Sequence, residues 1–280
     1  MSRARIVIVT AMTAILAGAP WRNFDVVLRI YLTGEPCLLS AWGLVRADRM
    51  PGRQGRLAFG FLMSERARPV PRHELADVLW PEGPPPALDI ALSALVSKLR
   101  ALLIEARADR HVISAADGCY RVELPAATWI DTEAAHEAVH GAEAALRSGA
   151  YAAAYGPAAV AAAILRRPFL PGAGGDWVER RRDALRQLLV RALDVLAEVH
   201  GENQEPALAV RIAEQAISLE PFRESGYRRL MQLQYRAGNR AEALRVYERC
   251  RRLLDQELGT PPSQETEALI RLLARGTAQA

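Results

Sequence analysis

The feature that most constrains this chain is a spacing of 34 residues between matching apolar positions in its C-terminal half. Five pairs keep this spacing: Leu193 and Tyr227, Leu196 and Leu230, Ala209 and Ala243, Ala213 and Tyr247, and Ala216 and Cys250. A fixed period of this length is typical of a small structural unit that stacks on its own copies, because one unit cannot bury its apolar face alone. Unrelated alanine- and leucine-rich helices would not produce five pairs at one spacing. We therefore predict true repeats.

Thirty-four residues is the period of the tetratricopeptide helix–turn–helix unit. Ala209 and Ala243 are small enough for close helix contacts, and Pro221 stands where such a unit ends. A similar turn near Gly149 places a first repeat at about 135–168, and a Pro/Gly-rich loop at 168–176 leads into a helix at 177–199. We predict an all-α, tetratricopeptide-like domain over residues 129–273, with Asp131 as the N-cap of its first helix.

Before residue 125 the pattern changes to short strands and helices. Alternating side chains predict strands at 28–32 and 37–39, and apolar periodicity predicts helices at 56–63, 72–79 and 87–105. Two further strands, at 111–113 and 120–124, are joined by Asp117-Gly118, a strong hairpin signal. Residues 28–124 are therefore predicted to form a compact α+β domain. The fold class expected for the whole chain is mainly α.

Residues 1–27 allow two interpretations. Arg3 and Arg5 precede the apolar run Ile6–Leu16, and Ala17-Gly18-Ala19 resembles a cleavage site, as in a secretory signal. Two threonines interrupt the run, however, and Pro20 would occupy the first position after cleavage, where cleavage is disfavoured. The run is also too short to cross a bilayer as a helix. We therefore expect an N-terminal extension of undefined role, either an extra strand or a poorly ordered segment.

Composition excludes several classes of protein. Hydrophobic residues make up 50% and charged residues 24% of the chain, as in soluble globular proteins and unlike disordered ones. The three cysteines lie far apart, which excludes a disulfide framework and zinc-ribbon spacings and fits the reducing cytoplasm. Residues 28–124 carry 13 basic and 11 acidic side chains. This small excess permits a local nucleic-acid-binding patch but does not require one.

One motif points to a different chemistry. His136-Glu137-Ala138-Val139-His140 is an H-E-x-x-H sequence on a predicted helix, where two histidines one turn apart can bind zinc while the glutamate polarises a water molecule. Zinc needs a third ligand, and only Glu143 follows nearby. No other pattern in the sequence pairs a nucleophile with a base. We therefore expect no metal, no cofactor and no enzymatic activity, and two exposed or partly packed histidines.

The predicted helix at 87–105 offers a better candidate site. At 100° per residue its leucines and Val96 fall on one side, which would bury the helix. The opposite side carries Ile90, Ser93, Ala94, Ser97, Lys98 and Ala101, with Arg100 at its edge. A slim face of small side chains can enter the major groove of DNA, where Ser and Lys donate to bases or phosphates. The alternative is the solvated surface of an ordinary helix.

Several segments resemble those of known regulators. Val70–Pro81, Ala91–Arg100 and Gly118–Arg121 resemble the winged helix of OmpR-type regulators. Asp176–Glu179, Leu219–Glu224, Ala237–Leu244 and Glu257–Gly259 resemble the bacterial transcriptional activator domain. In this order they resemble the SARP family of actinobacterial pathway-specific activators. The resemblance covers about residues 28–273 and implies a winged-helix domain at 28–124 followed by the helical domain.

The resemblance also implies a function. SARP-type activators read direct repeats near promoters on double-stranded DNA, with the helical domain assisting homodimer formation and contacting RNA polymerase. Arg72 and Lys98 would then hold phosphates, and Ser93, Ser97 and Arg100 would face or flank bases. Arg121, from the predicted hairpin, completes the expected DNA-binding set. We expect a cytoplasmic regulator with no membrane partner. The alternative is a tetratricopeptide-type protein-interaction module whose winged helix no longer reads DNA.

Overall fold

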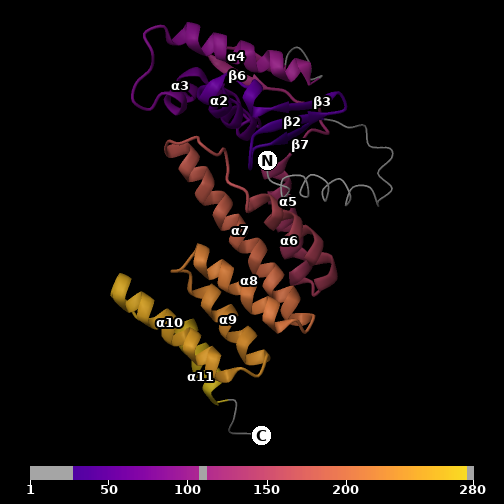
Figure 1. Ribbon diagram of the computed structural model, residues 1–280. Coiled ribbons are helices and arrows are strands. Elements are labelled where there is room, and N and C mark those ends of the chain that lie inside the picture. Colours follow the sequence, from indigo (N-terminus) through magenta and orange to yellow (C-terminus); the bar gives the residue numbers. More distant parts are fainter. Residues whose placement is uncertain (1–27, 107–111, 276–280) are drawn as a thin grey trace, which may run out of the picture.

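The computed structural model describes residues 28–106 and 112–275. The expected extension at 1–27 lies outside these described residues. The fold is mainly α, with an N-terminal α+β winged helix followed by an all-α, tetratricopeptide-like repeat domain (Figure 1). Helix α4 (Leu88–Glu105) lies along the outer side of the winged helix, at the opposite end of the molecule from α11 (Gln264–Arg275). No helix in the described ranges is long and apolar enough to cross a membrane.

The N-terminal sheet has four strands in the order β3-β2-β1-β7. Strands β1 (Arg29–Tyr31) and β2 (Cys37–Ser40) lie close to the strands predicted from sequence. They pair antiparallel, and β3 (Gly43–Arg46), which the sequence did not predict, pairs antiparallel with β2. Strand β7 (Trp129–Ile130) pairs parallel with β1, with Ile30 opposite Ile130. Both isoleucines are buried. The segment assigned by sequence to the start of the helical domain thus contributes a strand to the N-terminal sheet.

Three helices and a second sheet complete the winged helix. After a short 3-10 helix at Ala47–Arg49, the helices are α2 (Gly52–Ser64), α3 (Arg72–Leu79) and α4. The second sheet has the order β4-β6-β5, from β4 (Val70–Pro71), β5 (Ile113–Ala116) and β6 (Cys119–Val122). Asp117 and Gly118 join β5 to β6 with φ angles of 50° and 72°, so the predicted turn is confirmed. The first strand of the hairpin was predicted at 111–113 but lies at Ile113–Ala116, and residue 111 is outside the described residues.

The helical domain is a stack of antiparallel helix pairs. Its helices are α5 (Asp131–Arg147), α6 (Tyr151–Leu165), α7 (Asp176–Glu202), α8 (Pro206–Leu219), α9 (Glu224–Arg236), α10 (Arg240–Leu258) and α11. The 34-residue spacing relates α7 and α8 to α9 and α10. Ala209 and Ala243 are buried at equivalent positions, as expected for small side chains where helices approach closely. The predicted repeats are confirmed.

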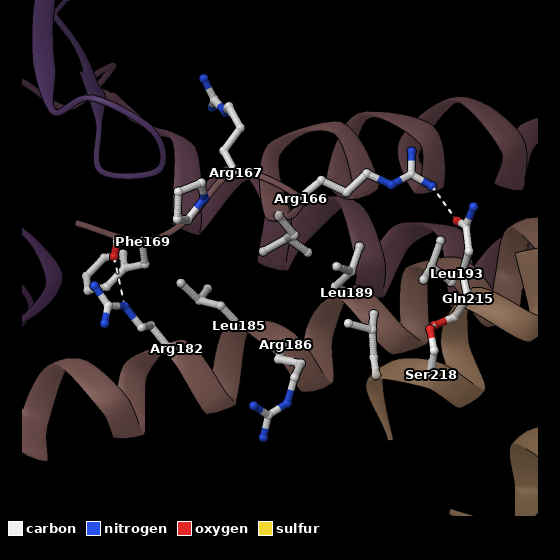
Figure 2. A pocket seen from close by; sticks show the side chains of 13 residues that line it. Arg166, Arg167, Phe169, Arg182, Leu185, Arg186, Leu189, Leu193, Gln215 and Ser218 are labelled. Carbon is white, nitrogen blue, oxygen red and sulfur yellow. Dashed lines mark hydrogen bonds between the residues drawn. The ribbon is translucent and has the colours of Figure 1, made fainter. Parts of the chain in front are cut away.

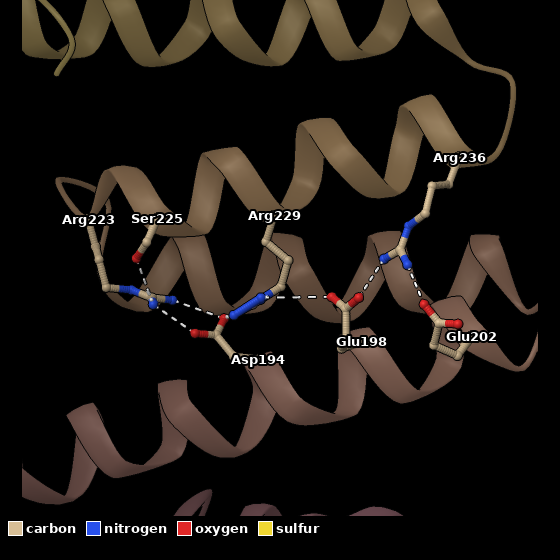
Figure 3. A network of polar contacts seen from close by, with 7 residues as sticks. All are labelled: Asp194, Glu198, Glu202, Arg223, Ser225, Arg229 and Arg236. Carbon is tan, nitrogen blue, oxygen red and sulfur yellow. Dashed lines mark hydrogen bonds and ion pairs between the residues drawn. The ribbon is translucent and has the colours of Figure 1, made fainter. Parts of the chain in front are cut away.

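Ion pairs connect one repeat to the next (Figure 3). Acidic residues one turn apart on α7 face arginines from α9 and the turn before it: Asp194 pairs with Arg223 and Arg229, Glu198 with Arg229 and Arg236, and Glu202 with Arg236. The Arg223 guanidinium donates to both oxygens of Asp194, at 2.7 and 3.0 Å. Because Asp194 is largely buried, this bidentate contact also satisfies a carboxylate that has little access to water.

The winged helix is fixed to the helical domain through Asp131. This residue was expected to be an N-cap, but the N-cap is Ile130 and Asp131 is the first residue of α5. Its fully buried carboxylate accepts hydrogen bonds from the Leu32 N–H (3.0 Å), the Thr33 N–H (2.9 Å) and the Thr33 hydroxyl (2.7 Å). The Asp131 carboxylate therefore accepts hydrogen bonds from the residues that follow β1, and it does not cap its own helix.

Further contacts join the winged helix to the helical domain at this seam, the boundary between the two domains. The Arg66 guanidinium, from the winged helix, donates two hydrogen bonds of 2.7 Å to the carboxylate of Glu133 on α5. The Phe61 and Trp177 rings meet edge to face, 4.9 Å apart between centroids. The absence of a side chain at Gly60 lets α2 approach the loop before α7, since a Cβ there would lie 2.3 Å from Leu170 Cδ1. The two domains therefore share one continuous core.

Candidate nucleic-acid interface

Helix α4 has one buried side and one exposed side, as the sequence predicts. Leu92, Val96, Leu99 and Leu103 are at most 1% exposed and pack into the winged-helix core. The exposed residues on the other side include Asp89, Ile90, Ser93, Ala94, Ser97, Lys98 and Ala101. These are small or unbranched at the positions that follow Ile90, so nothing bulky projects from the middle of the helix.

Lys98 is the cation at the centre of this face. Its side chain is exposed, and in the described part of the chain it has no carboxylate partner. Ser97 lies beside it and Ser93 one turn before it, both exposed. The structure therefore places three of the predicted site residues on one surface of α4, with an uncompensated charge among hydroxyl groups.

Arg72 is tied to its surroundings. It is the first residue of α3, and its Nη2 lies 3.0 Å from the Asp89 carboxylate and 3.4 Å from the Ser93 hydroxyl oxygen, both on α4. Its guanidinium also lies over the Tyr120 ring at 5.6 Å from the centroid. Asp89, with 87% of its side chain exposed, was not singled out from the sequence. Its negative charge stands on the α4 face and offsets that of Arg72.

Arg100 and Arg121 belong to the hairpin side of the site. Arg100 is half-buried, and its Nε and Nη2 donate to the Ile113 carbonyl oxygen at 2.9 and 2.6 Å. It therefore holds β5 against α4. Arg121 is exposed in the middle of β6, between the buried Tyr120 and Val122. It projects from the outer face of the hairpin and, among the described residues, has no ion-pair partner.

The H-E-x-x-H motif lies elsewhere, on α5. His136 and His140 are exposed, with ring centroids 4.4 Å apart, and the Nδ1 of His140 lies 2.8 Å from the His136 carbonyl oxygen. Burial and the neighbouring His140 lower the pKa of His136. Glu143 is held by two hydrogen bonds from Arg191, of 2.8 and 2.7 Å. In the described ranges no three potential ligands come close enough to hold a metal ion.

Comparison with known proteins identifies the helical domain. The sequence profile described as the bacterial transcriptional activator domain matches residues 130–273. Regulatory protein AfsR of Streptomyces coelicolor is 30% identical over 209 residues, which cover 75% of this chain and 20% of AfsR. Transcriptional regulatory protein EmbR of Mycobacterium tuberculosis is 29% identical over 216 residues, which cover 76% of this chain and 55% of EmbR.

A solved structure agrees with these relatives. Mycobacterium tuberculosis EmbR in complex with a low-affinity phosphopeptide superposes with a TM-score of 0.80 and 26% identity, over 91% of this chain and 67% of that chain. The likeness thus includes the winged helix as well as residues 130–273. The chain spans about a fifth of AfsR and about half of EmbR. The matched family is one of transcriptional regulators and not of enzymes. The chain therefore belongs to the bacterial transcriptional activator domain family, as a SARP-type protein in which a winged helix precedes that domain.

Proposed function

We propose that this protein is a sequence-specific DNA-binding transcriptional regulator that inserts α4 into the major groove. The observation that carries the proposal is the exposed face of α4, with small side chains around the unpaired Lys98. A helix of this profile fits a groove about 12 Å wide. The neighbouring α3 and the β5–β6 hairpin flank α4 as the supporting helix and wing of a winged helix do.

Each predicted site residue has a role in this proposal. Lys98 and Arg72 contact phosphates, which position the protein on DNA without reading sequence. Ser93 and Ser97 face base edges. Arg100 flanks the bases and keeps the hairpin at a fixed distance from α4 through its bonds to Ile113. Arg121 reaches the backbone beside the groove from the hairpin.

The target site, the oligomeric state and the cellular compartment are proposed from the family resemblance. We propose that the protein activates transcription from direct repeats near a promoter, and that it does so as a homodimer on DNA in the cytoplasm. The relatives named above are a regulatory protein and a transcriptional regulatory protein, which supports this proposal. The helical domain would contact RNA polymerase, as the family resemblance implies, and it lies on the side of the winged helix opposite α4 (Figure 1).

One observation favours a second candidate, a protein-interaction module that no longer reads DNA. The DNA-facing side is only weakly basic, since Asp89 offsets Arg72 and Asp117 stands at the tip of the hairpin. Negative charge at both places repels phosphate. The two candidates differ in one measurable property, which is the preference for the natural upstream DNA.

Variants on α4 test the proposal. Lys98→Ala should weaken binding to all sequences about equally and flatten the log–log salt dependence by about one unit, because a phosphate contact carries no base information. Ser97→Ala should change the preference among sites with a small change in affinity. Arg251→Ala, an exposed position on α10, is the control. Titration of labelled upstream DNA at several salt concentrations measures all three. If Lys98→Ala behaves like Arg251→Ala, α4 is not in the groove.

A further inference from the structure

A groove runs between the end of α6, the middle of α7 and α8 (Figure 2). Its volume is about 520 Å³, within the range of small-molecule sites in proteins. The floor is apolar and comes from all three helices: Leu165, Leu185, Leu189, Leu193 and Leu219. Helices α6, α7 and α8 belong to the helical domain, and α4 lies on the outer side of the winged helix, so the proposed DNA contact does not use this groove.

The rim of the groove is basic. Four arginines line it and no acidic residue does: Arg166, Arg167, Arg182 and Arg186. A ligand that enters the groove therefore meets apolar side chains below, and guanidinium groups together with the neutral Gln215 and Ser218 around it. This charge pattern favours an anion and disfavours a cation of the same shape.

Three of these arginines already have carboxylate partners. Arg167 lies 3.4 Å from Asp131, and Arg182 lies 2.7 Å from Glu179. Arg182 also donates to the carbonyl oxygens of Phe169 and Leu170, so it is held in place. Arg186 pairs with Asp183 and Glu220 and points away from the leucines in Figure 2. None of these three offers an uncompensated charge.

Arg166 differs from the others. It follows the last residue of α6, and its Nη2 donates across the groove to the Gln215 side-chain oxygen at 3.1 Å, a neutral partner. Among the described residues no carboxylate pairs with it. Figure 2 shows this contact extending over one end of the leucine floor. An incoming carboxylate can replace the amide oxygen, because a charged acceptor forms the stronger hydrogen bond with a guanidinium.

We propose that this groove binds a small monoanionic amphiphile, with its carboxylate on Arg166 and its apolar body on the leucines of α6, α7 and α8. One uncompensated cation next to one apolar floor matches a ligand with one negative group and one hydrocarbon portion. A ligand with several negative groups would find the other arginines occupied. Binding would join α6 to α8 in place of the Arg166–Gln215 bond and so stabilise the first two helix pairs.

The test uses the full chain and a fluorescent fatty-acid probe, 11-(dansylamino)undecanoate, without DNA. We expect saturable binding, displacement by decanoate, and no displacement by decyltrimethylammonium, which has the same chain and the opposite charge. Arg166→Gln should weaken probe binding about tenfold, as expected for the loss of a charge-assisted hydrogen bond. The matched control is Arg147→Gln, which removes the same charge from the exposed end of α5.

A second variant tests the apolar floor of the groove. Ser218 is exposed on the rim, so Ser218→Phe should place a ring over the leucines and abolish probe binding while the fold is kept. The proposal is overturned if Arg166→Gln binds the probe as well as Arg147→Gln does. It is also overturned if decyltrimethylammonium displaces the probe as well as decanoate, or if wild type does not bind the probe. Because DNA is absent, none of these outcomes depends on the proposed regulatory function.

Discussion

Replacing Asp131 with alanine tests whether the seam between the two domains depends on one buried carboxylate. Asp131→Ala leaves three buried donors without their acceptor: the N–H groups of Leu32 and Thr33 and the Thr33 hydroxyl. It also removes the ion-pair partner of Arg167, whose side chain is partly exposed and can turn to water. A buried donor that loses its partner costs about 1–3 kcal/mol. Water can enter the space that the carboxylate leaves, and the desolvation cost of the carboxylate itself is removed, so the lower end applies to each donor. The free energy of unfolding should fall by about 3–5 kcal/mol.

Asp176→Ala is the matched control, because Asp176 is the exposed first residue of α7 as Asp131 is the buried first residue of α5. Both changes remove an acidic group from a helix N-terminus, an effect of about 0.3–1 kcal/mol. Urea unfolding followed by circular dichroism gives both free energies, and the excess for Asp131→Ala measures the buried hydrogen bonds. If the two variants differ by less than about 1 kcal/mol, the carboxylate does not hold the seam and this reasoning is refuted.

Three further predictions address the DNA face, the repeats and the histidine motif. Asp89→Asn should release Arg72 and remove a negative charge from α4. The affinity for DNA, measured by titration at low salt, should therefore rise roughly fivefold. An unchanged affinity would show that Arg72 does not approach phosphates. Ala243→Leu should lower the free energy of unfolding by about 1–3 kcal/mol through overpacking, and a neutral result would place residue 243 outside the helix contact. Purified protein should contain no stoichiometric zinc, and chelator should not change the melting temperature of wild type or His140→Ala; a zinc content of one per chain that this variant loses would contradict the expectation.

Much of the fold could be predicted from periodicity. The helix at 72–79 has the bounds expected, and the 34-residue spacing correctly paired Ala209 with Ala243, because close helix packing leaves a strict local requirement for small side chains. The hairpin turn at Asp117-Gly118 was equally clear, since its positive φ angles favour these two residue types. Such signals are local, so the sequence shows them directly.

The features that the sequence did not reveal depend on contacts between distant residues. Strand β7 is only two residues long and is formed because β1, about a hundred positions earlier, pairs with it. Asp131 looked like an N-cap because its partners, which follow β1, lie equally far away in the chain. The pairing of Arg72 with Asp89 likewise needs α3 and α4 to be packed together. No local pattern marks any of these contacts.

The candidate DNA-binding site likewise combines local features, which the sequence predicts, with contacts between distant residues, which it does not. Amphipathic spacing correctly predicted the exposed side of α4 with Ser93, Ser97 and Lys98. It could not show that Arg100 is engaged with the Ile113 carbonyl, because that contact depends on where the hairpin packs. The roles of these residues in DNA binding stay predictions.

A protein that reads DNA sequence through α4 must prefer its own upstream DNA to other DNA. The measurement is fluorescence anisotropy of labelled duplexes at physiological salt, with the natural upstream region and a random duplex of equal length. We expect binding to the upstream region at least about a thousandfold tighter than to random DNA, the lower end for specific recognition. Equal affinity for the two duplexes would show that α4 does not read sequence and would favour the protein-interaction module.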